Sequence, residues 1–96
     1  MQNQTYQLFM GMNIPNGGHV TEHDWQAFMH EIIDNHFDGY TVSDVDGVWK
    51  GEHEHTKCVS ICTNKYQQVL AVANAYKQLF KQDSVAIQQL QPMQFV

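Results

Sequence analysis

The chain has 96 residues, with five Lys, no Arg and ten acidic residues, and its net charge is −5. A negative surface without arginine repels phosphate backbones, so we expect no nucleic-acid partner. An apolar content of 43% is enough for one hydrophobic core, which excludes intrinsic disorder. We therefore predict a single domain over residues 1–96, with a core at about 5–90 and a tail at 91–96.

Neither a membrane span nor a secretion signal is visible. No run of apolar residues reaches the roughly 20 that a transmembrane helix needs. The first ten residues, MQNQTYQLFM, lack the basic start of a signal peptide. We therefore expect no membrane partner and a cytoplasmic location.

Charge is distributed unevenly along the chain. Residues 1–55 carry one Lys against nine acidic residues, a net charge of −8, whereas residues 56–96 carry four Lys against one acidic residue, a net charge of +3. Such asymmetry favours head-to-tail contact between copies of the chain, although uneven surfaces also arise by chance.

In the first half, an apolar run at 6–12 that ends in a loop at 13–18 predicts a strand. Thr21 is a predicted helix N-cap, with Asp24 at the capping-box position. The residues that follow repeat at helical spacing and predict a helix over about 22–35. The alternating, β-branched stretch at 40–49 predicts a second strand with a kink or bulge at Gly47.

In the second half, the polar residues 51–55 predict a hairpin tip and residues 58–62 a third strand. Cys58 and Cys62 share one face of that strand about 13 Å apart, too far for a disulfide, so we expect free thiols in a reducing compartment. Asn64 is predicted to cap a long helix that reaches about Phe80, and residues 85–87 predict a fourth strand.

The element order βαββαβ predicts an α+β fold, the ferredoxin-like sandwich with two helices on one face of a four-stranded antiparallel sheet. Two helices cover only one face of such a sheet. We expect apolar residues on the other face, namely Phe9, Tyr40, Val42 and Cys58. A bare apolar face on a small domain predicts contact with further copies.

The densest polar cluster is the segment from Trp49 to His55. His53 and His55 alternate on a strand and are possible metal ligands, but they lack a third ligand and helical rigidity, so we expect no metal. Glu54 beside Trp49 is a possible site for a cationic, aromatic ligand. A surface Glu near a packed Trp accounts for the same residues, and spacing alone does not decide between these readings.

Several segments resemble a family of small uncharacterised bacterial proteins over residues 6–88. They are YQLFMG (6–11), WQAF (25–28), FDGYTV (37–42), GVW (47–49), EHTKCV (54–59), AY (75–76) and FKQDSV (80–85). The layout also resembles the phage S-adenosylmethionine (SAM) lyases. The shared features are a strand that ends in Gly-x-aromatic, a polar turn, a Glu that opens the next strand, and a Gln-Asp-x-Val start to the last strand.

The resemblance implies a PII-like homotrimer with ligand sites between subunits. It also implies cleavage of SAM, a sulfonium, to methylthioadenosine and homoserine lactone without a cofactor. It assigns the essential carboxylate to Glu54 and an aromatic contact to Trp49, and we expect Phe9, Tyr40 and Gln88 to bind the substrate as well. The alternative is a non-catalytic PII-like trimer that binds a nucleotide or a SAM-type ligand.

Overall fold

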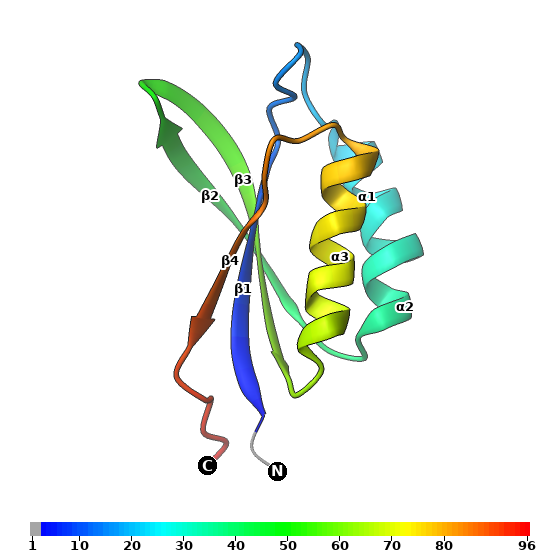
Figure 1. The fold of residues 1–96 in the computed structure, drawn as a ribbon, viewed down its shortest axis with the longest axis vertical. Helices are drawn as coiled ribbons and strands as arrows, with labels where there is room; N and C mark the ends of the chain where they lie inside the picture. Colours follow the sequence, from blue (N-terminus) through cyan, green and yellow to red (C-terminus); the bar gives the residue numbers. More distant parts are fainter. Residues whose placement is uncertain (1–2) are drawn as a thin grey trace.

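The structure is a computed structural model that describes residues 3–96. Its elements are β1 (Gln4–Gly11), α1 (Glu22–Phe28), the π-helical turn η1 (Met29–Ile33), α2 (Asp34–His36), β2 (Thr41–Trp49), β3 (Glu52–Thr63), α3 (Tyr66–Leu79) and β4 (Ala86–Leu90). The strands form one antiparallel sheet in the order β2-β3-β1-β4. All helices cover the same face of this sheet, and the other face is open (Figure 1). The predicted α+β, ferredoxin-like plan is confirmed.

The first helical stretch begins where the sequence predicts. The backbone N–H of Asp24 donates to the Thr21 hydroxyl over 3.0 Å, which satisfies one of the free amides at the helix start. α1, η1 and α2 follow one another without a break, so residues 22–36 form a single helical stretch that contains one π turn. The second helix begins at Tyr66, with Lys65 at the cap position in place of the predicted Asn64.

The core lies between the sheet and the helices. Leu8, Val59 and Ile61 on the sheet are at most 1% exposed, and the helices contribute a cluster of aromatic rings. Tyr76 lies at the centre of this cluster, with its ring 5.2 Å from that of Phe28 in an edge-on arrangement that favours attraction between rings. Burial of each such side chain contributes about 1.5–3 kcal/mol.

The hairpin of β2 and β3 differs from its prediction. The strands pair in regular register from Thr41↔Ser60 to Trp49↔Glu52, so the predicted bulge at Gly47 is wrong. The turn consists of Lys50 and Gly51, with φ of 51° and 80°, which is the conformation of a tight two-residue hairpin. Residues 52–55 therefore belong to a strand and not to a tip. Because β1 follows β3 only as far as Gly11↔Thr56, the hairpin projects beyond the sheet (Figure 1).

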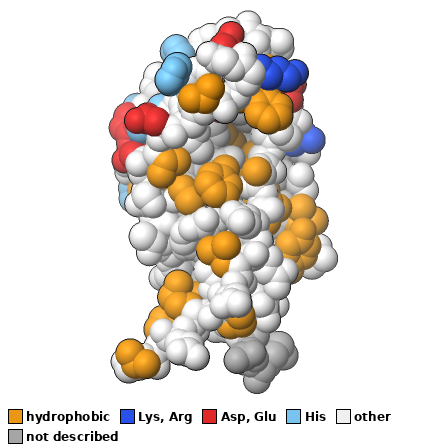
Figure 2. All heavy atoms as spheres, turned by 90° about the vertical axis from the view of Figure 1, so that its left-hand side faces the viewer, with side chains coloured by type: hydrophobic (Ala, Val, Ile, Leu, Met, Phe, Trp, Pro, Cys, Tyr) orange, Lys and Arg blue, Asp and Glu red, His pale blue; other side chains and the backbone are white. Residues whose placement is uncertain are grey.

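The open face carries Phe9 and Cys58, which pair with each other. Figure 2 shows hydrophobic side chains gathered over the middle of this face. The prediction that Val42 and Tyr40 also lie on the open face is wrong, because both pack against the core under the helices. Val42 pairs with the fully buried Val59 and therefore shares its face. Within residues 3–96, the helices are too short or too polar to cross a bilayer.

Candidate functional site

A cleft of about 400 Å³ lies on the open face, where the hairpin leaves the sheet. Side chains that alternate along the strands form its floor, because every second residue of a strand points to the same face. Phe9, Ala86 and Thr56 belong to this floor, and Trp49 lines the cleft from the hairpin. The loop after β1 and the loop before β4 complete the cleft, so segments that are distant in the sequence meet there.

Glu54 is held inside the cleft by the backbone of the loop after β1. Its Oε2 atom accepts a hydrogen bond of 3.1 Å from the backbone N–H of Asn13. The carboxylate lies directly over Gly11, where an added Cβ atom would be 2.5 Å from Oε2. The side chain is half-buried. Glu54 is therefore a carboxylate with a defined position and not a mobile surface group.

Two further carboxylates, Glu52 and Asp83, line the same cleft. Within residues 3–96, neither they nor Glu54 form an ion pair. Their negative charges add in a partly enclosed space, and such a field attracts cations. Trp49 is 71% exposed, and the Lys50 ammonium lies 5.8 Å from the centre of its ring. The cleft therefore combines unneutralised negative charge with an accessible aromatic face, which suits a cation with a planar group.

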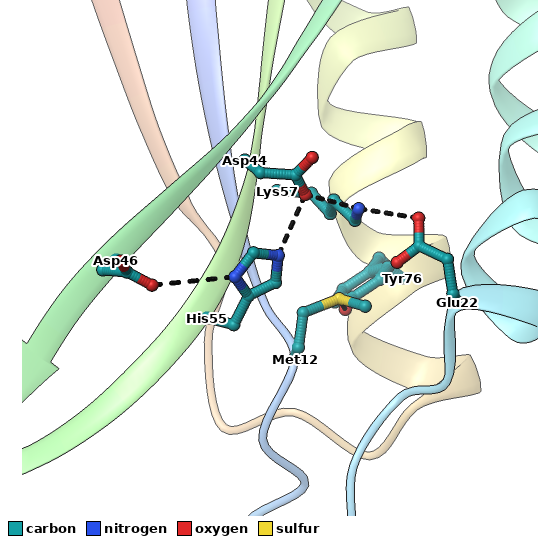
Figure 3. A network of polar contacts seen from close by, with 7 residues as sticks. All are labelled: Met12, Glu22, Asp44, Asp46, His55, Lys57 and Tyr76. Carbon is teal, nitrogen blue, oxygen red and sulfur yellow. Dashed lines mark hydrogen bonds and ion pairs between the residues drawn. The ribbon is translucent and has the colours of Figure 1, made fainter.

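The charged residues on the other face of β3 form a continuous network with residues of β2 and α1 (Figure 3). Lys57, whose side chain is 4% exposed, donates to Glu22 over 2.8 Å and to Asp44 over 2.5 Å. His55 lies 2.9 Å from Asp44 and 3.7 Å from Asp46. In the described part of the chain, no three His, Cys, Asp or Glu side chains are grouped in a way that could hold a metal ion.

The network changes the pKa values of Lys57 and Asp44. Burial alone lowers the pKa of Lys57, but the hydrogen bonds to Asp44 and Glu22 and their charges outweigh burial and leave this pKa raised. The hydrogen bonds from Lys57 and His55 lower the pKa of Asp44. Behind the cleft, burial and the negative charge of Glu54 raise the pKa of Tyr76.

The structure brings together three of the predicted site residues, Glu54, Trp49 and Phe9, in the cleft. Tyr40 is not among them. It lies on the helix side, where its hydroxyl donates to Asp34, and burial together with this bond raises its pKa to about 12. Gln88 is on the open face opposite Gln7, two residues further along β4 than the cleft residue Ala86.

Sequence reasoning missed the cleft residues at the end of β1 and in the two adjoining loops. Gly11 is the last residue of β1 and Asn13 follows the strand, whereas Gln82 and Asp83 precede β4. A signal existed for the second pair, because the Gln-Asp-x-Val segment is part of the family resemblance. For Gly11 the only available signal was a glycine at the end of an apolar strand. Glycine is required at position 11 because of a contact with Glu54, which is distant in the sequence, and the sequence alone does not show that contact.

The fold is similar to those of two solved structures. A phage SAM lyase in complex with S-methyl-5'-thioadenosine has a TM-score of 0.72 and 16% identity, over 94% of this chain and 81% of that chain. A phage SAM lyase in the apo state has a TM-score of 0.71 and 15% identity, over 99% of this chain and 94% of that chain. At these identities the likeness establishes the fold. No curated protein matches the sequence. A family model described as "Protein of unknown function (DUF3574)" matches residues 5–95, so the chain belongs to the DUF3574 family.

Proposed function

We propose that this protein is a SAM lyase, which cleaves SAM to methylthioadenosine and homoserine lactone. The observation that carries the proposal is the fixed carboxylate of Glu54, in a cleft with aromatic walls and without an ion pair among residues 3–96. The solved structures of the same fold support it, because one of these phage SAM lyases holds S-methyl-5'-thioadenosine. SAM has the properties that the cleft favours, since it combines a sulfonium, an ammonium and an adenine ring.

The reaction needs few protein groups. A carboxylate oxygen of SAM attacks the γ-carbon of the same molecule, and a carbon–oxygen bond forms as the γ-carbon–sulfur bond breaks. The sulfur takes the electron pair and becomes a neutral thioether, while the five-membered lactone keeps the ammonium. No proton is transferred, so no acid–base pair is required. The protein contributes by folding the substrate into the reactive shape and by excluding water.

In this scheme Glu54 binds the ammonium or the sulfonium of SAM. Its half-buried position strengthens the attraction relative to water, and its bond from Asn13 keeps the carboxylate in place. Trp49 and Phe9 offer apolar surface for the adenine and the methylene groups. Charge is neutralised as the sulfonium and the substrate carboxylate react, so an apolar environment favours the transition state over the separated charges.

We also propose that the active form is a homotrimer with sheets packed around the threefold axis. Its support is the apolar surface of the open face, where Val45 is 37% and Trp49 is 71% exposed. Such packing would cover the cleft and exclude water from it. Light scattering at micromolar protein should give the mass of a trimer, and a stable monomer would contradict both the trimer and a site between subunits.

The direct test is to incubate the purified protein with SAM and to separate the products by chromatography. We expect methylthioadenosine and homoserine lactone in equal amounts. Homoserine in place of the lactone, from the first time points, would indicate attack by water and contradict the lyase reaction. Calorimetric binding of SAM without any product would favour the alternative, a PII-like module that binds a SAM-type ligand.

A further inference from the structure

We propose that Gly11, fixed by the hydroxyl of Tyr76, is a positioning residue for the Glu54 carboxylate. This inference rests on the proposed function and adds to it the parts of the chain that hold the reactive geometry. The first observation is steric. A Cβ atom at Gly11 would lie 2.5 Å from Oε2, 2.6 Å from Cδ and 2.7 Å from Oε1 of Glu54. These distances are far shorter than the 3.5–4.0 Å of normal contacts, so any side chain at this position displaces the carboxylate.

The second observation is that the same backbone segment binds the carboxylate it accommodates. Two residues after Gly11, the N–H of Asn13 donates to Oε2 of Glu54 over 3.1 Å. A hydrogen bond to a charged acceptor is shorter and stronger than one between neutral groups. Gly11 therefore gives space and Asn13 gives direction, and both effects depend on the path of three backbone residues.

The third observation is that the core fixes this path from behind. The Tyr76 hydroxyl, on a residue with 0% exposure, donates to the carbonyl oxygen of Gly11 over 2.7 Å. The side-chain amide of Gln82 donates to the carbonyl oxygen of Asn13 over 2.9 Å. The backbone N–H of Met12 donates to the carbonyl oxygen of His55, also over 2.9 Å. The three residues of the segment are thus bonded to α3, to β3 and to the loop before β4. The negative charge of Glu54 also raises the pKa of Tyr76, which places the two groups in one electrostatic environment.

The test compares two glycine substitutions, on the two strands that flank β3. Gly11→Ala should reduce kcat/KM for methylthioadenosine formation by about 100-fold, because misplacement of a reacting group by about 1 Å has an effect of this size. Gly47→Ala is the matched control. Gly47 pairs with Glu54 in the sheet, but its added Cβ would meet nothing closer than 3.8 Å. We expect Gly47→Ala to retain activity within about threefold. Equal activities of the two variants would overturn the proposal.

A second readout does not depend on turnover. The amide proton of Asn13 reports its hydrogen bond to Glu54 by NMR, and Glu54→Gln should move its chemical shift in the wild-type background. In the Gly11→Ala background the same change should leave the shift almost unaltered, because the bond has already been lost. If the wild type has no activity on SAM, the proposed function fails and this cycle still tests the positioning. An equal response of Asn13 in both backgrounds would overturn the positioning itself.

Tyr76→Phe keeps the ring in the core and removes the hydroxyl, which donates to the Gly11 carbonyl oxygen and also lies 3.7 Å from the sulfur of Met12. We expect a loss of about tenfold in kcat with a smaller change in KM, and a shifted Asn13 amide signal. Should Gly11→Ala fail to fold, this variant decides the question with the same two measurements. Unchanged kcat together with an unchanged Asn13 signal in Tyr76→Phe would then overturn the proposal.

Discussion

The two faces of β3 use their charged side chains in opposite ways. On the helix side, Lys57 binds Glu22 and Asp44, and Asp44 also binds His55. On the open side, Glu54 receives a backbone N–H and forms no ion pair within residues 3–96. Only a few residues of one strand separate these groups, and the alternation of side chains sends them to different environments.

This difference indicates which charges serve the fold and which are available to a ligand. A buried ammonium needs partners within the protein, because an unpaired buried charge is strongly unfavourable. Lys57 has those partners, so it offers nothing to a ligand. A carboxylate that is fixed by one amide and lined by apolar surface attracts a cation from solution instead. The comparison predicts that changes on the open side affect activity and that changes on the helix side affect stability.

The largest effect is expected for Glu54→Gln. This change keeps the shape of the side chain and removes its charge, so kcat/KM for SAM should fall by about 10²–10³, or about 3–4 kcal/mol. The melting temperature should stay close to that of the wild type, since no ion pair within the described residues is lost. The matched control is Glu31→Gln, which removes one charge from an exposed position on η1. Comparable losses in the two variants would show that net charge, and not the cleft, controls the reaction.

Lys57→Met should show the reverse pattern. The methionine fills the space of the buried stem but loses both charge-assisted hydrogen bonds, and the burial cost of the ammonium disappears at the same time. We expect a net decrease of about 1–2 kcal/mol in the free energy of unfolding, measured with urea. The kinetic constants should change by less than about threefold. A variant that is stable but inactive would place Lys57 in the site and contradict the division between the two faces.

The network also predicts how stability depends on pH. The pKa of Asp44 is lowered from 3.8, so its contribution is present above that pH and is lost as the pH falls through its folded-state value. The pKa of Lys57 is raised from 10.5, so its contribution is present below that pH and is lost as the pH rises through its folded-state value. The pair therefore stabilises the fold between about pH 4 and pH 10.

The measurement is the melting temperature at pH 7 and pH 3 for the wild type and Asp44→Asn. The melting temperature of the wild type should fall further between pH 7 and pH 3 than that of the variant, because the variant has no Asp44 carboxylate to protonate. Equal losses would mean that the ion pairs of the helix side do not contribute to acid sensitivity.

Sequence reasoning recovered the topology because periodicity and capping are local signals. The helix start at Thr21 and the buried positions Trp25 and Phe28 depend on nearest neighbours, and the structure confirms them. The face of the sheet on which a residue lies was harder to predict. Tyr40 is of a residue type that often binds ligands, but only the pairing of β2 with β3 shows that it lies on the helix side of the sheet. Gly11 was overlooked because its role depends on contact with a residue 43 positions later.

A smaller effect is expected for Trp49→Ala. The side chain is 71% exposed, so it contributes little to the core, and its main loss should be contact with the substrate. We expect KM for SAM to rise about tenfold, or about 1.4 kcal/mol, with little change in melting temperature. Val48→Ala is the matched control, because Val48 is 62% exposed and points to the other face of the same strand. If both variants change KM equally, the ring has no specific contact with the ligand.

The smallest effects are expected for the two histidines of the hairpin, and they separate the lyase from a metal-dependent reaction. His55→Ala removes contacts to Asp44 and Asp46, but these exposed pairs contribute at most about 1 kcal/mol. His53→Ala leaves the hydrogen bond of 3.3 Å from the Asn13 side chain intact, because this bond goes to the backbone oxygen of His53. Turnover should therefore stay within about twofold in both variants, and EDTA should not alter it. Because lactone formation needs only a fixed carboxylate and an apolar cleft, loss of activity on chelation or in either variant would mean that the hairpin binds a metal and that the proposed chemistry is wrong.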